Sequence, residues 1–169
     1  MKLATFDAIV AALDGAGVRY LVAGGLAVNA HGYLRMTNDV DLVVQLERAN
    51  IRLAFDALAS IGYRPTVPVS VEQVADPATR RQLVEGKAMQ VLNFHSDLHK
   101  LMAVDIFITE PFDFDREYAT ALQGTLSPGH NVRFVSIPTL IDMKRRSSRA
   151  HDIVDIERLQ MIQDGRERT

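Results

Sequence analysis

The sequence predicts an α/β (α+β) fold in which a mixed β-sheet is flanked by helices. Segments with helical spacing of apolar residues alternate with short β-branched runs, and neither an internal repeat nor a linker separates them. The chain has 169 residues, 47% of them hydrophobic, which is enough to bury one core. We therefore expect a single domain over residues 1–169, with a helical C-terminal part from about residue 137.

The elements are assigned from the spacing of apolar residues. Phe6, Ile9, Val10 and Leu13 recur at i, i+3, i+4 and i+7, which is the spacing of an amphipathic helix. The segment DVDLVV, residues 39–44, is rich in the β-branched residues that strands favour. The other expected elements are strands at 20–24, 88–96, 103–108 and 132–136, and helices at 26–32, 51–61, in pieces within 68–87, and from 137.

Composition excludes several classes of protein. No apolar run approaches the roughly 20 residues of a membrane span, and the N-terminal segment, with an acid at Asp7, does not read as a signal peptide. We expect a cytoplasmic protein with no membrane partner. Because cysteine is absent, metal ligands must be oxygen or imidazole. A net charge of −2 argues against a broadly basic surface, although MKRRSSRAH, residues 143–151, forms a local basic patch.

Two aspartates stand in the otherwise apolar strand 39–44. Side chains alternate along a strand, so Asp39 and Asp41 point to the same face. Such a pair repels itself, and a divalent cation, which prefers oxygen ligands, relieves that repulsion. Asp105 has the same setting in strand 103–108 and would complete a magnesium site. The alternative, that an acid is solvated at a strand edge or caps a helix, fits any one of the three better than all three together.

The diglycine Gly24–Gly25 lies where a strand is expected to turn into a helix. Residues without Cβ let backbone N–H groups approach a phosphate, and the helix N-terminus adds partial positive charge. A triphosphate could bind there. Strand, diglycine and helix alone are more often only a tight turn, but paired aspartates at a fixed distance favour phosphate binding.

These segments together resemble a known superfamily. AGG at residues 23–25, a spacer of thirteen residues and DVDL at 39–42 match the signature of the DNA polymerase β-like nucleotidyltransferases. Residues 24–44 are especially similar to the AbiEii/MNT-type enzymes, a group that includes toxins of toxin–antitoxin and phage-abortive systems. MKRRSSRAHDIVDIERL, residues 143–159, resembles their later motif of Lys, a basic residue and a helical Asp. One departure is Gly25, where many active members have Ser.

The resemblance implies the nucleotidyltransferase fold and metal-dependent transfer of NMP from an NTP to an acceptor hydroxyl. Asp39 and Asp41 would hold Mg²⁺ or Mn²⁺ bridging the nucleotide phosphates. Asp105 would bind a second metal ion and assist deprotonation of the acceptor. Gly24 and Gly25 would cradle the phosphates.

Two residues just ahead of the aspartate pair are predicted to contact the nucleotide. Arg35 and Thr37 are placed to meet triphosphate oxygens or to tune the acids by charge pairing. For Arg35 the alternative is a surface pair with Asp39.

The family pattern also places Lys144 and Asp152 at the site, as triphosphate or base-side contacts. If residues 140–162 form one helix, these two lie about 12 Å apart along its axis. Long side chains, or a break near Ser147 and Ser148, are then needed to bring both to one nucleotide.

The acceptor is left open among tRNA, protein and small molecules. Arg145, Arg146 and Arg149 could meet a polyanion such as tRNA. The resemblance implies, as one context, the toxin-like component of a toxin–antitoxin or defence system with an antitoxin partner. The alternative function is a catalytically weak nucleotide-binding or partner-binding module on the same fold. A phosphohydrolase fits less well, because the histidines lack metal-ligand spacing.

Overall fold

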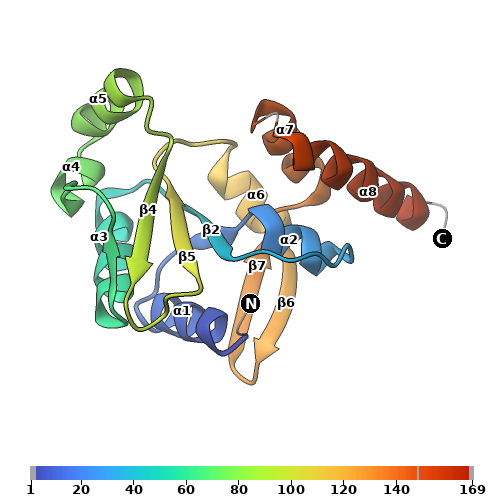
Figure 1. Cartoon of the computed structure of the whole chain (residues 1–169), viewed down its shortest axis with the longest axis horizontal. Helices are drawn as coiled ribbons and strands as arrows, with labels where there is room; N and C mark the ends of the chain where they lie inside the picture. The colour runs from blue at the N-terminus through green and yellow to red at the C-terminus, as the bar shows by residue number, and fades with distance from the viewer. Residues whose placement is uncertain (1–2, 148, 168–169) are drawn as a thin grey trace.

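The computed structural model describes residues 3–147 and 149–167, which form a seven-stranded mixed sheet flanked by helices (Figure 1). The strands are β1 (Tyr20–Val22), β2 (Asp39–Val44), β3 (Tyr63–Pro65), β4 (Val91–Ser96), β5 (Ala103–Phe107), β6 (Leu122–Ser127) and β7 (His130–Phe134). Their order across the sheet is β3-β4-β5-β2-β1-β7-β6. The predicted fold class is confirmed.

Strand β2 lies at the centre of the sheet and sets the position of the aspartates. It runs parallel to β5 on one side and antiparallel to β1 on the other. Val40 and Leu42 are fully buried, whereas Asp41 is only partly buried, as the alternation of side chains predicts. In the parallel register Asp41 lies directly opposite Asp105. The sheet therefore brings together two acids that are far apart in the sequence.

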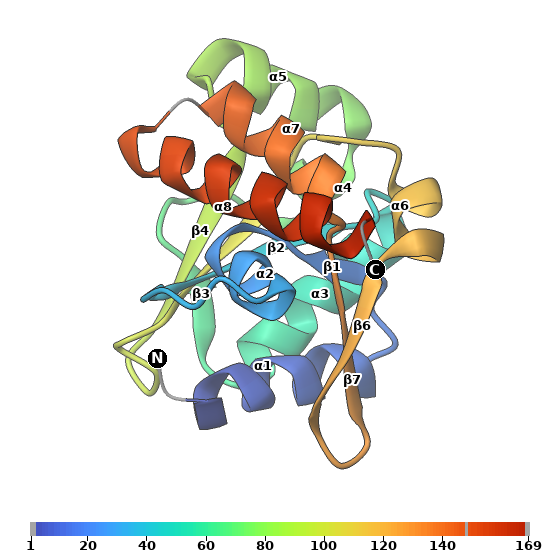
Figure 2. The ribbon, with the colours of Figure 1, turned by 90° about the vertical axis from the view of Figure 1, so that its right-hand side faces the viewer.

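Helices flank the sheet (Figure 1). They are α1 (Leu3–Gly15), α2 (Gly24–His31), α3 (Arg48–Ser60), α4 (Val71–Ala75), α5 (Pro77–Lys87), α6 (Phe114–Thr120), α7 (Ile137–Ser147) and α8 (Ala150–Glu167). Helix α1 packs against α3, and α2 packs against both α7 and α8 (Figure 2). Phe6, Ile9, Val10 and Leu13 of α1 are buried, as their spacing predicts. No helix in the described part of the chain is long and apolar enough to cross a membrane.

The polar segment 68–87 is helical in two pieces, as predicted, and its caps explain the division. Ser70 accepts a hydrogen bond from the Gln73 N–H, and the Gln73 side chain accepts one from the Ser70 N–H, which completes a capping box for α4. Asp76 then caps α5, and Pro77 occupies its first turn.

The C-terminal region is two helices. α7 ends at Ser147 and α8 begins at Ala150, so of the two alternatives left open by the sequence, a continuous helix over 140–162 and a break near Ser147 and Ser148, the structure has the break. Ser148 lies outside the described residues. β3, α6 and β6 were not predicted from the sequence, because each is short and lacks a periodic apolar pattern. The strand expected at 132–136 is β7, which begins earlier, at His130, and pairs with the missed β6.

Candidate active site

The glycine turn and the central strand are in direct contact. Gly24 has φ +58° and begins α2, and a Cβ atom at this position would lie 1.8 Å from Asp41 Oδ2. The Ala23 N–H donates to the Asp41 carbonyl at 2.8 Å, which fixes the turn to β2. Only glycine tolerates both this backbone conformation and this close approach.

The N-terminus of α2 has no cap from its N-cap residue, because Ala23 makes no side-chain cap hydrogen bond to the first-turn N–H groups. These groups and the helix dipole provide the polar environment that phosphate oxygens prefer. The turn therefore has the local structure that the sequence predicted for a phosphate site.

Arg35 and Thr37 lie at the second glycine. A Cβ atom at Gly25 would lie 2.7 Å from Thr37 Oγ1 and 3.2 Å from Arg35 Nη1. The space that a side chain at position 25 would take is thus filled by a hydroxyl and a guanidinium. The Thr37 hydroxyl lies close to where a serine side chain at position 25 would stand.

The Asp41 carboxylate is in an environment that disfavours its charge. Burial, together with the nearby charges of Asp105 and Asp39, raises its pKa to about 6 against the opposing effect of Lys144 and Arg149. Two acids in register and partly buried repel each other, so this part of the site favours a bound proton or cation.

Asp105 is fixed by a neighbour on β4. The Asn93 amide, opposite Asp105 in the antiparallel register, donates to Asp105 Oδ1 at 2.6 Å. Burial raises the pKa of Asp105, and the Asn93 hydrogen bond and the charge of Arg149 partly offset that rise. Asn93 was not predicted from the sequence, because only the pairing of β4 with β5 makes it a neighbour of the acid.

Asp39 lies at the exposed start of β2, opposite Ala103 in the register. Within residues 3–147 and 149–167, no group of three or more His, Asp or Glu side chains could hold a metal ion by itself. The three predicted carboxylates are therefore not a complete cage in the protein alone. Mg²⁺ is commonly held by one or two carboxylates plus substrate phosphates, and the paired Asp41 and Asp105 fit that kind of site.

A buried ion network connects α7, α8 and the loop before β2. Lys144 Nζ lies 2.9 Å from Asp152 Oδ1 and 2.6 Å from Asp155 Oδ2. Arg35 donates to the same Asp155 through Nε and Nη2, at 2.9 and 2.8 Å. All but Arg35 are less than a tenth exposed. The predicted alternative pairing of Arg35 with Asp39 is wrong, because Asp155 takes the guanidinium.

Asp152 joins the two C-terminal helices. It accepts hydrogen bonds from the Ser147 hydroxyl, from Lys144 and from the Arg149 N–H. Burial alone would raise the pKa of Asp152, but these hydrogen bonds and the charge of Lys144 hold it below its ordinary value. The break in the helix brings Lys144 and Asp152 together as an ion pair, and Lys144 also pairs with Asp155.

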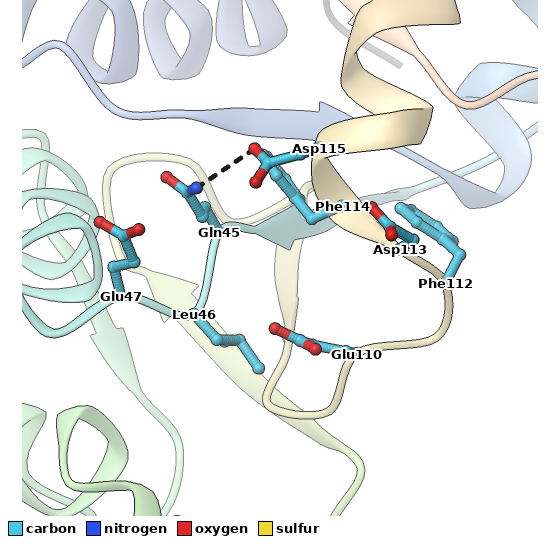
Figure 3. A pocket seen from close by; sticks show the side chains of 8 residues that line it. All are labelled: Gln45, Leu46, Glu47, Glu110, Phe112, Asp113, Phe114 and Asp115. Carbon is cyan, nitrogen blue, oxygen red and sulfur yellow. Dashed lines mark hydrogen bonds between the residues drawn. The ribbon is translucent and has the colours of Figure 1, made fainter.

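Asp39 begins β2, and the pocket drawn in Figure 3 lies beyond the opposite end of that strand. Gln45 donates to Asp115 across it at 3.3 Å. None of the predicted site residues lines this pocket. Its lining residues are Gln45, Leu46, Glu47, Glu110, Phe112, Asp113, Phe114 and Asp115.

No protein-family model and no curated protein sequence matches the chain. The lincosamide antibiotic adenylyltransferase LnuA, with lincomycin bound, superposes with a TM-score of 0.57 at 14% identity, over 88% of this chain and 90% of its own. The solution structure of the antibiotic-resistance factor ANT(2'')-Ia gives a TM-score of 0.59 at 16% identity, over 99% of this chain and 92% of its own. Its structure with adenylyl-2''-tobramycin gives 0.55 at 15% identity, over 99% and 98%. These likenesses show that the chain has the nucleotidyltransferase fold.

Proposed function

We propose that the chain is a metal-dependent nucleotidyltransferase, which transfers NMP from an NTP to an acceptor hydroxyl. The observation that carries this proposal is the contact of the Asp41 carboxylate with Gly24, the first residue of α2. A helix N-terminus without a side-chain cap suits phosphate, and paired carboxylates suit a divalent cation. This contact supports the proposal because a triphosphate needs both a phosphate-binding helix N-terminus and carboxylates that hold its divalent cation.

The residues of the chain divide the work of binding and proton transfer. The first-turn N–H groups of α2 and the Thr37 hydroxyl would bind phosphate oxygens, and Arg35 would donate to them. Asn93 orients the Asp105 carboxylate through Oδ1, and this carboxylate would accept the acceptor's proton. As the acceptor oxygen bonds to the α-phosphorus, the bond to the bridging oxygen breaks and pyrophosphate leaves.

Asp41 and Asp105, with Asp39 beside them, are the residues that would hold Mg²⁺ or Mn²⁺. Such an ion, when bound, neutralises phosphate charge and polarises the reacting oxygens. The raised pKa of Asp41 supports this assignment, because a cation offsets both the burial and the repulsion that raise it.

The acceptor is proposed by class. LnuA is described with lincomycin bound and ANT(2'')-Ia with an adenylylated tobramycin, so a small hydroxyl-bearing molecule of the antibiotic class is one candidate. The exposed Arg145 and Arg149, at the junction of α7 and α8, support a polyanion such as tRNA as another. The motif wording supports an AbiEii/MNT-type enzyme of a toxin–antitoxin pair, with an antitoxin as partner.

The experiment that tests the function is a transfer screen. Each of the four α-labelled NTPs is incubated with Mg²⁺, the protein and one of four acceptors: an aminoglycoside, a lincosamide, total tRNA or cell lysate. We expect one NTP and one acceptor class to become labelled by the wild type, and not by Asp105→Asn. NTP binding without labelling of any acceptor would favour the alternative, a nucleotide-binding module without turnover.

A further inference from the structure

Arg35 is held at the phosphate turn by a residue 120 positions later in the sequence. We propose that Asp155 of α8 is a positioning residue, which holds the Arg35 guanidinium over the N-terminus of α2 so that it can bind the nucleotide's phosphates. This inference rests on the proposed function and adds to it a residue that acts through another.

The contact between the two side chains is bidentate. Nε and Nη2 of Arg35 each donate to a different oxygen of Asp155, at 2.9 and 2.8 Å, a geometry that fixes the plane of the guanidinium. The backbone of Arg35 is fixed as well, because its N–H donates to Asn29 Oδ1 and its carbonyl accepts from Asn29 Nδ2, both at 2.9 Å. The guanidinium therefore has one orientation, set by α2 and α8 together.

That orientation leaves donors at the turn. Of the five N–H groups of a guanidinium, three donate to Asp155 and to the Met36 carbonyl. The other two have no acceptor within the described residues, and the side chain is 25% exposed. Nη1 lies 3.2 Å from where a Cβ of Gly25 would stand. A phosphate at the N-terminus of α2 would thus meet donors that are already oriented.

Asp155 can fix the orientation of the Arg35 guanidinium because its own side chain is buried. The Asp155 side chain is only 2% exposed, so its charge is not screened by water and its place is fixed by packing. Its Oδ2 also accepts from Lys144 at 2.6 Å, so one carboxylate orders two cations. The carboxylate also offsets their charge. If Asp155 positions Arg35, removing its carboxylate weakens nucleotide binding. If Asp155 instead competes with phosphate for the cations, removing it strengthens nucleotide binding.

The test is a double-mutant cycle on NTP binding. Asp155→Asn removes the charge, and Arg35→Lys keeps a cation on the loop but cannot make the bidentate contact. We expect each to raise the Kd and KM for Mg²⁺–NTP about 10-fold with a much smaller change in kcat, and the double variant to be no weaker than either single one. Glu157→Gln, which alters an exposed acid of the same helix, should leave all three constants unchanged.

Tighter or unchanged NTP binding by Asp155→Asn would overturn the inference, as would effects that multiply in the double variant. A folding defect in Asp155→Asn is addressed by Asp155→Glu, which keeps the charge but displaces the carboxylate by one methylene. It should also raise Kd, and an unchanged Kd overturns the inference. If the wild type binds none of the four NTPs, the proposed function fails and this inference fails with it.

Discussion

Replacing Asp41 with asparagine should stabilise the metal-free protein at neutral pH while it abolishes transfer. The side chain is partly buried against Gly24, and Asp105 lies opposite it on β5. Its charge is therefore disfavoured in the folded protein. Asparagine has nearly the same shape but no charge to desolvate. The substitution removes the repulsion and leaves the packing unchanged.

The magnitude follows from the pKa. Burial, and then the charges of Asp105 and Asp39, raise the pKa of Asp41 from 3.8 to about 6. A shift of about two units corresponds to about 3 kcal/mol of unfolding free energy. Because the folded protein holds this proton to a higher pH than the unfolded chain does, stability falls as pH rises from about 4 to about 6. The asparagine variant does not lose stability in this way. Its unfolding free energy should therefore equal that of the wild type below about pH 4 and exceed it by the full amount above about pH 7.

The assay is urea unfolding of both proteins between pH 4 and pH 8, in EDTA so that no divalent cation binds. Asp56→Asn, an exposed acid on α3, is the matched control and should follow the wild type at every pH. The reasoning is refuted if Asp41→Asn is equally or less stable than the wild type at pH 8, or if its advantage does not shrink on acidification.

Other changes have definite expected results. Gly24→Ala should destabilise the protein by at least about 1 kcal/mol and abolish transfer, because its Cβ would lie 1.8 Å from Asp41 Oδ2; unfolding and labelling assays measure both. Asp39→Asn and Asp105→Asn should lose transfer while melting within a few degrees of the wild type in EDTA. Lys144→Met should lower the unfolding free energy by about 3–5 kcal/mol, because it leaves two buried carboxylates without their shared cation; urea unfolding tests this. Millimolar Mg²⁺ with an NTP should raise the melting temperature more than Mg²⁺ alone, and no shift with either would count against the metal assignment.

Much of the fold follows from local patterns. The i, i+3, i+4, i+7 spacing located α1, and the β-branched run at 39–44 located β2 to the residue. Because side chains alternate along that strand, Asp39 and Asp41 were predicted to point to the same face. The short strand β3 and the hairpin strand β6 were missed because their stability comes from pairing with a neighbouring strand, which no local pattern records.

The site was predictable where its residues belong to one motif. The resemblance placed the glycine turn and the aspartate pair at one site, and the pairing of β1 with β2 brings Ala23 beside Asp41. The partner of Arg35 was not predictable in this way, because Asp155 meets it only after α8 folds back against α2. Asn93 likewise becomes a neighbour of Asp105 only through the β4–β5 register. The groups that carry the proposed chemistry are therefore visible in the sequence, whereas Asn93 and Asp155, which orient two of them, become visible only in the fold.

The most direct test of nucleotidyl transfer follows the two ends of the triphosphate separately. The protein is incubated with Mg²⁺, cell lysate as the source of acceptor and an NTP labelled either at the α- or at the γ-phosphorus. We predict that the α label moves to an acceptor while an equal amount of γ label appears as pyrophosphate, and that Asp41→Asn does neither. A γ label on the acceptor would instead show phosphoryl transfer, and no consumption of any of the four NTPs would contradict the proposed function.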